Sequence, residues 1–86
     1  MNVAYLPVFI RQYKKFSSAL QEEIDEKIAL FKKDPKNPLL KVHKLKGKFA
    51  DRYGFSVNYS HRVIFAYLSN TEVVLMAVGT HDIYKC

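Results

Sequence analysis

Histidine and arginine residues gather in the second half of the chain and offer acid–base and phosphate-binding chemistry. His43, His61 and His81 all lie after residue 39. Histidine can gain or lose a proton near neutral pH, and a carboxylate beside it, such as Asp82 next to His81, raises its pKa. Arg62 carries a planar fork of donors that suits a phosphate. The alternatives are ordinary structural roles, with Arg62 pairing at a strand end and His61 serving as a turn residue.

A row of lysines follows the first of these histidines. Lys44, Lys46 and Lys48 alternate along an extended segment, with His43 before them and Arg52 soon after. Alternate residues of a strand project to one side, so this row suits a phosphate backbone. A solvated sheet edge, where lysines prevent edge-to-edge aggregation, would carry the same pattern.

The last turn of the sequence adds an aromatic side chain. Tyr84 follows Gly79 and His81 closely, and a tyrosine there can stack on a base or bind a phosphate. The alternative is a C-terminal turn whose tyrosine packs back on the core.

Composition limits the possible partners and excludes several kinds of site. The 86 residues carry a net charge of +6 and 49% hydrophobic residues, which predicts one domain over residues 1–86 with an anionic partner. Apolar runs are too short for a membrane helix, and no secretory signal precedes them. The single cysteine, Cys86, excludes an internal disulfide and suits the cytoplasm. The histidines lack metal-ligand spacing, and no P-loop or nucleophile elbow occurs, so we expect neither a metal nor a cofactor.

Two helices are expected before the basic segment. Residues 3–9 predict a strand that lies at an edge or breaks near Pro7, and residues 10–16 predict a short helix. Ser18 and Gln21 form a capping box for a longer helix that ends at Asp34. Its apolar face comprises Leu20, Ile24, Ile28 and Phe31.

Three strands are expected after the basic segment. Residues 52–59 alternate, with Tyr53, Phe55, Val57 and Tyr59 on one face, while residues 62–68 and 72–78 are almost continuously apolar. The order β-α-α-β-β-β predicts an α+β fold: an N-terminal strand and a helical hairpin packed on one face of a small, mainly antiparallel sheet.

Three stretches together resemble a known family. HKLKG (43–47), YGFSVNYSHRVIFAY (53–67) and VVLMAVGTHDIY (73–84) resemble the RelE/ParE superfamily of bacterial toxins, and most closely the YafQ-type members of its RelE branch. The resemblance implies a ribosome-dependent mRNA endoribonuclease of a type II toxin–antitoxin system. It also implies a cognate antitoxin that binds and neutralises the toxin. The toxin–antitoxin complex would repress their operon, and the toxin would contact operator DNA only through that complex.

The resemblance also assigns site residues. It implies that His81 is the general acid and His43 the base, with exchangeable roles, that Arg62 contacts the scissile phosphate and that Tyr84 orients a nucleotide. The remaining expected RNA-binding residues are Lys44, Lys46, Lys48, Arg52 and His61.

Two positions depart from the YafQ-type pattern. Ser56 stands where those toxins carry a further histidine, and Ser60-His61 stands where they carry an aspartate. These departures leave two alternatives open: a ParE-like inhibitor of DNA gyrase, and a non-catalytic toxin that acts only as an antitoxin- or DNA-binding module.

Overall fold

The chain begins with an edge strand and a short helix. The computed structural model describes residues 1–47, 51–80 and 83. Strand β1 spans Asn2–Tyr5, and helix α1 spans Pro7–Lys14. The strand expected over residues 3–9 lies at the sheet edge and breaks just before Pro7, as predicted, but it is shorter than expected, and the helix begins three residues before its predicted start. Pro7 explains both differences, because its fixed φ and missing N–H suit the first turn of a helix.

The second helix, α2, spans Ser18–Lys33 and buries the expected face. Ile24, Ile28 and Phe31 are buried. The predicted capping box is wrong, because the N-cap is Ser17, whose Oγ accepts from the Leu20 N–H at 3.2 Å. The Gln21 amide instead donates to the carbonyl of Tyr13 at 3.0 Å, which ties the two helices together.

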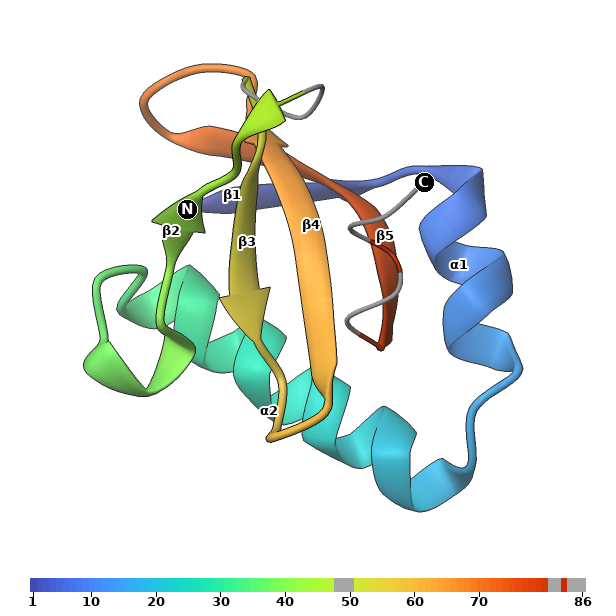
Figure 1. Cartoon of the computed structure of the whole chain (residues 1–86). Coiled ribbons are helices and arrows are strands. Elements are labelled where there is room, and N and C mark those ends of the chain that lie inside the picture. The colour runs from blue at the N-terminus through green and yellow to red at the C-terminus, as the bar shows by residue number, and fades with distance from the viewer. Residues whose placement is uncertain (48–50, 81–82, 84–86) are drawn as a thin grey trace.

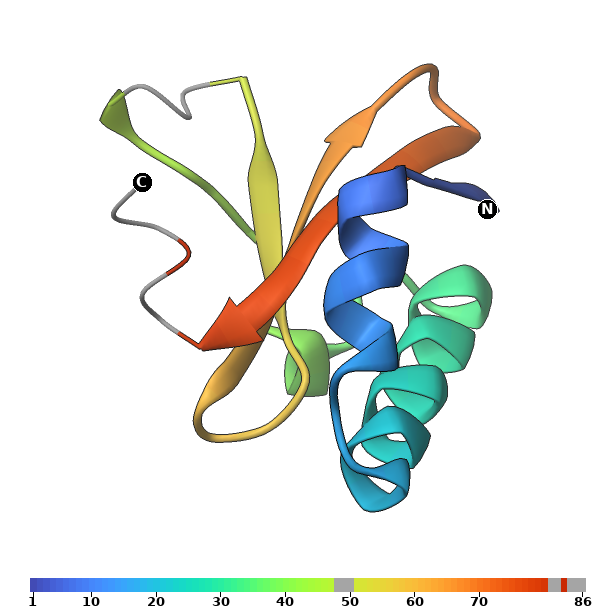
Figure 2. The same cartoon turned by 90° about the vertical axis from the view of Figure 1, so that its right-hand side faces the viewer.

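Five strands form one sheet in the order β1-β5-β4-β3-β2 (Figures 1 and 2). After a 3₁₀ turn at Pro38–Leu40 come β2 (His43–Lys44), β3 (Tyr53–Ser56), β4 (His61–Tyr67) and β5 (Glu72–Thr80). β1 pairs with β5 in parallel, and every other pair is antiparallel. Both helices lie on one side of the sheet, as Figure 2 shows. The predicted α+β fold is confirmed, and the predicted order β-α-α-β-β-β is found with one addition, the two-residue strand β2 in the basic segment.

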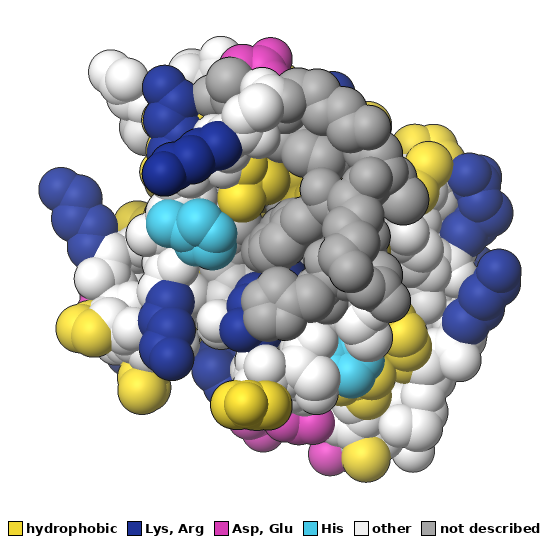
Figure 3. All heavy atoms as spheres, in the orientation of Figure 1, with side chains coloured by type: hydrophobic (Ala, Val, Ile, Leu, Met, Phe, Trp, Pro, Cys, Tyr) yellow, Lys and Arg dark blue, Asp and Glu magenta, His cyan; other side chains and the backbone are white. Residues whose placement is uncertain are grey.

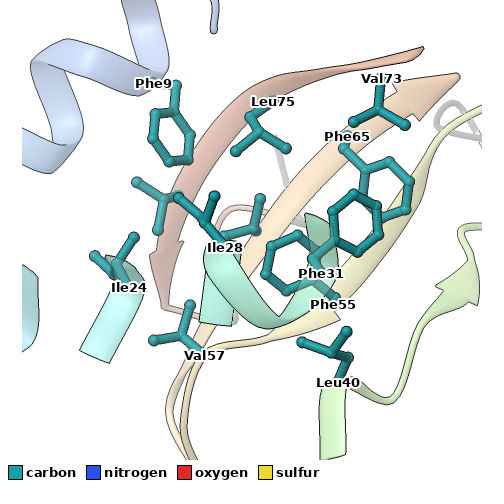
Figure 4. Packing of buried hydrophobic residues seen from close by; sticks show 12 residues of the cluster. Phe9, Ile24, Ile28, Phe31, Leu40, Phe55, Val57, Phe65, Val73 and Leu75 are labelled. Carbon is teal, nitrogen blue, oxygen red and sulfur yellow. The ribbon is translucent and has the colours of Figure 1, made fainter. Parts of the chain in front are cut away.

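Aromatic rings fill the space between the helices and the sheet (Figure 4). The ring of Phe31 lies 4.9 Å from that of Phe55 and 4.9 Å from that of Phe65. All three side chains are completely buried. Tyr59, expected on the same face as Phe55, is instead 95% exposed, because β3 ends at Ser56 and Tyr59 lies in the following loop.

The second half of β5 extends beyond the reach of β1. β1 pairs only with Glu72 to Leu75, and α1 runs beside the rest of β5. There the Gln12 side chain accepts the N–H of Val78 at 2.8 Å, in place of a strand neighbour. In the described part of the chain, neither helix is long and apolar enough to cross a membrane.

Candidate nucleic-acid interface

Strand register divides the predicted site residues between two faces of the sheet. Phe55, Val63 and Val78 belong to the core on the helix side. Their neighbours Ser56, Arg62 and Gly79 pair in one row across β3, β4 and β5. Because successive residues of a strand face opposite ways, this row lies on the face away from the helices, called here the outer face. Figure 1 looks onto that face, with α2 behind the sheet.

His43 belongs to the outer face. It pairs with Gly54, two residues before Ser56 on β3, so it shares a face with the Ser56–Arg62 row. Its side chain is exposed, and its Nδ1 lies 3.0 Å from the carbonyl oxygen of Lys41. A carbonyl oxygen only accepts hydrogen bonds, so this contact requires a proton on Nδ1. The basic nitrogen of the neutral ring is then Nε2, which suits the expected role as base.

Arg62 secures the loop between β3 and β4. Its Nη1 donates to the carbonyl oxygens of Asn58 at 2.7 Å, Tyr59 at 3.3 Å and His61 at 3.0 Å. Arg62 therefore has a structural role, which one of its nitrogens, Nη1, performs by holding the loop. These three bonds to the loop all use Nη1, and the guanidinium has further donors on Nε and Nη2 that suit an anionic ligand.

His61 lies on the opposite face from Arg62. Its ring meets the edge of Phe16 at 5.6 Å between centroids and 82° between planes, and Phe16 follows helix α1. The Asn58 Oδ1 accepts from the N–H of His61 at 2.8 Å and from that of Ser60 at 2.9 Å. The register therefore does not bring His61 together with His43. Asn58, which builds the loop, was not among the predicted residues, although asparagine in a turn is a known signal.

Lys44 and Lys46 follow the edge of the sheet and not its outer face. Lys44 pairs with Tyr53 and alternates with His43, so it projects to the helix side. Lys46 is exposed, while Leu45 between them is 8% exposed and donates its N–H to the carbonyl of Arg52 at 2.9 Å. Figure 3 shows basic side chains along the side of the molecule where β2 lies. The predicted site residues Lys48, His81 and Tyr84 lie outside the described residues.

An apolar hollow of about 340 Å³ lies beside β4 and β5, and Val8 and Gln12 of helix α1 also line it. Ile83, the one described residue after Thr80, lines this hollow together with Arg52, Ile64 and Ala77. Ile64 is 3% exposed although it lies on the outer face, so this face has apolar packing of its own. Sequence reasoning did not identify Ile83, because a lone isoleucine in a C-terminal turn gives no signal.

Among the described residues, no group of three or more His, Cys, Asp or Glu side chains could hold a metal ion. His43 and Arg62 are the two expected site residues that the register clearly places on one face. A titratable ring and a guanidinium on that face can serve proton transfer and phosphate binding.

The fold is similar to solved structures of bacterial toxins. YafQ from E. coli strain BL21(DE3) matches with a TM-score of 0.78 at 15% identity, covering 95% of this chain and 94% of YafQ. A YoeB/ParE toxin from Agrobacterium tumefaciens gives 0.76 at 20% identity, covering 94% of this chain and 99% of that one. A chain of the heterotetrameric YoeB-YefM toxin-antitoxin complex from Staphylococcus aureus gives 0.75 at 19% identity, covering 94% and 97%. No protein-family model and no curated protein matches the sequence. This chain therefore has the fold of these toxins.

Proposed function

We propose that this chain, having that fold, is the toxin of a bacterial type II toxin–antitoxin system and cleaves mRNA on the ribosome. The observation that carries the proposal is the match of nearly the whole fold to YafQ and to a YoeB/ParE toxin. The partner that inhibits it would be a cognate antitoxin, as YefM accompanies YoeB in the matched complex. A net charge of +6 supports both an RNA substrate and an acidic inhibitor.

The proposed reaction uses the 2′-hydroxyl of the message as its nucleophile. His43 Nε2 takes the proton from this hydroxyl, the oxygen attacks the adjacent phosphorus, and His81 gives a proton to the leaving 5′-oxygen. Each acid–base group contributes about 10²–10⁴-fold to the rate. The protonated His43 and deprotonated His81 exchange protons with water before the next turnover.

Charge stabilisation and RNA binding fall to other residues in this proposal. The Arg62 guanidinium donates from Nε and Nη2 to the phosphate whose negative charge grows in the transition state. Tyr84 stacks on a neighbouring base, and Lys44, Lys46, Lys48 and Arg52 hold the RNA backbone. His61 was expected to bind RNA as well, but its packing against Phe16 supports a structural role.

The test is primer extension on a defined message in a reconstituted translation system. The wild-type chain should cut within codons only when ribosomes are present, and His81→Ala and His43→Ala should each lower the rate by at least about 10²-fold. Both variants should still bind the antitoxin. Full cleavage by either variant would remove that histidine from the mechanism.

A salt titration tests the lysine edge separately. Each phosphate contact with single-stranded RNA contributes about 0.7 to the slope of log K against log salt, so Lys44→Ala/Lys46→Ala should lower the slope by about 1.4. Lys36→Ala, at an exposed turn after α2, is the matched control and should leave the slope unchanged. An unchanged slope in the double variant would exclude these lysines from RNA binding.

A gyrase supercoiling assay run in parallel distinguishes the alternatives. Inhibited supercoiling without cleavage would overturn the nuclease proposal in favour of a ParE-like gyrase inhibitor. Antitoxin binding without either activity would identify a binding module, the role that the serine at position 56 keeps open.

A further inference from the structure

The loop between β3 and β4 carries a tyrosine ring with almost no contact to the rest of the fold. Tyr59 is 95% exposed, the largest value among the exposed bulky apolar side chains that the structure describes, and Leu39 and Leu68 follow at 67% and 61%. A side chain this exposed contributes little to the stability of the folded state. Packing therefore does not explain an aromatic residue at position 59.

The backbone that carries this ring is held by hydrogen bonds within the loop. The Oδ1 of Asn58 accepts the N–H groups of Ser60 at 2.9 Å and His61 at 2.8 Å. The N–H of Val57 donates to the carbonyl of His61 at 3.0 Å. The Asn58 side-chain amide also donates to the Glu23 carboxylate of α2 at 3.4 Å, which ties the loop to the helix layer. The loop is thus preorganised, and a ligand bound by it would lose little affinity to backbone ordering.

The same loop connects the ring to Arg62. The Nη1 of Arg62 donates to the carbonyl oxygen of Tyr59 itself at 3.3 Å and to that of Asn58 at 2.7 Å. Figure 1 shows this loop at the end of β4 opposite to the turn between β4 and β5. A guanidinium that suits a phosphate therefore touches the backbone of a residue that exposes a flat ring. A nucleotide of unpaired RNA offers partners for both groups, a phosphate and a base.

We propose that Tyr59 is a base-stacking residue: its ring stacks on an unpaired base of RNA while Arg62 holds a neighbouring phosphate. The inference rests on the proposed function in taking RNA as the ligand, and it adds a nucleobase subsite to the Arg62 site. Every base has a flat face, so this subsite holds the strand without selecting its sequence.

The surroundings of the ring favour a base over an apolar protein surface. Aromatic residues that anchor protein interfaces lie in well-packed patches from which water is excluded. The neighbours of Tyr59 in the loop, Asn58 and Ser60, are polar instead. A single base stacked on one ring needs no wider apolar surface, and the positive charge of Arg62 attracts the strand that carries the base.

Loss of the ring should weaken substrate binding more than it slows the chemical step. Stacking of one base on an aromatic side chain contributes about 5–150-fold to affinity. The ring stacks on the strand before and during cleavage, so Tyr59→Leu should raise KM for message cleavage on ribosomes by about 5–150-fold with kcat within about twofold. Tyr59→Phe should keep the wild-type KM, because stacking requires the flat ring and not the hydroxyl. Both variants should keep the wild-type urea midpoint.

A direct binding measurement is possible because the chain contains no tryptophan. Tyr59→Trp introduces a single tryptophan, and a base stacked on it should quench its fluorescence during titration with a codon-length RNA. The same ribose-phosphate strand without bases keeps its phosphates and should leave the fluorescence unchanged. Leu68→Trp is the matched control, because Leu68 is exposed at the opposite end of β4, about 20 Å away, and its fluorescence should not respond.

The outcomes separate this inference from the proposed function. Wild-type KM in Tyr59→Leu, or equal quenching of Tyr59→Trp by the strand without bases, overturns the inference and leaves the nuclease proposal standing. Weaker antitoxin binding by Tyr59→Leu at unchanged RNA affinity would assign the ring to a protein interface and would also overturn the inference.

Two results concern the proposed function as well. A wild-type chain that neither cuts message nor binds the RNA overturns both proposals. A chain that cuts no message, but whose Tyr59→Trp fluorescence is quenched only by the RNA with bases, overturns the nuclease proposal alone. A raised KM in Tyr59→Leu that Tyr59→Phe does not share, at an unchanged urea midpoint, supports the inference.

Discussion

The acceptor that Gln12 supplies to β5 allows a quantitative test of how this sheet is completed. Val78 is 1% exposed, and its N–H donates to the Gln12 side chain at 2.8 Å because β1 has already ended. Replacing Gln12 with leucine removes the acceptor and brings an apolar side chain of similar size. The Val78 N–H is then buried without a partner.

The cost can be estimated from the chemistry of one orphaned donor. A buried N–H without an acceptor destabilises the folded state by about 1–3 kcal/mol. In a domain of this size each kcal/mol lowers Tm by about 4–8 °C, so a loss of about 2 kcal/mol corresponds to about 8–16 °C. Gln12→Glu keeps an acceptor and should retain most of the stability above pH 6.

The assay is urea denaturation, with Gln21→Leu as the matched control. Gln21 donates at 3.0 Å to the carbonyl of Tyr13, which also accepts the N–H of Phe16 at 3.2 Å. That carbonyl keeps a partner when Gln21 is lost, so the control should cost less than about 1 kcal/mol. Equal losses in the two leucine variants, or a loss below about 0.5 kcal/mol for Gln12→Leu, would refute the reasoning.

Two further predictions concern the helices. Ser17→Ala should destabilise the fold by about 1 kcal/mol because the Oγ of Ser17 caps α2, whereas Ser18→Ala should change the urea midpoint little. A larger loss for Ser18→Ala than for Ser17→Ala would instead support the capping box predicted at Ser18. Partial burial, and then the hydrogen bond to Asp25 and its charge, raise the pKa of Tyr13. The folded chain therefore holds this phenolic proton more tightly than the unfolded chain, so the contribution to stability is complete below the ordinary tyrosine pKa of about 10 and is lost as the pH rises through the raised value. Tyr13→Phe should weaken this alkaline loss in urea midpoints measured from pH 8 to 11, and an identical profile would contradict it.

Periodicity predicted the parts of the fold that depend on burial. The apolar spacing of Ile24, Ile28 and Phe31 identified the helix face, and the apolar run after Arg62 identified the central strand. Element ends were less predictable because they depend on local chemistry. Pro7 fits a strand edge and a helix start equally well in sequence, and Ser17 and Ser18 are both good capping residues.

The site was predictable by residue type more than by face. His43 and Arg62 share the outer face, as expected for one site. The prediction grouped Lys44 and His61 with them, but a strand turns each successive residue to the opposite side. The contacts of Arg62 with the loop carbonyls could not be predicted, because every residue has a backbone oxygen and the sequence does not indicate which of them Arg62 binds.

The pairing of β1 with β5 joins the two ends of the chain. Asn2 lies opposite Glu72 and Tyr5 opposite Leu75, so this pair forms only when almost the whole chain is available. Such non-local contacts fold late and slowly. During synthesis β1 leaves the ribosome well before β5, so the sheet cannot be completed until β5 has also emerged. A chain interrupted before β5 would lack the strand neighbour of β1 and the core side chains of Val73, Leu75 and Val78, and would be a target for proteolysis.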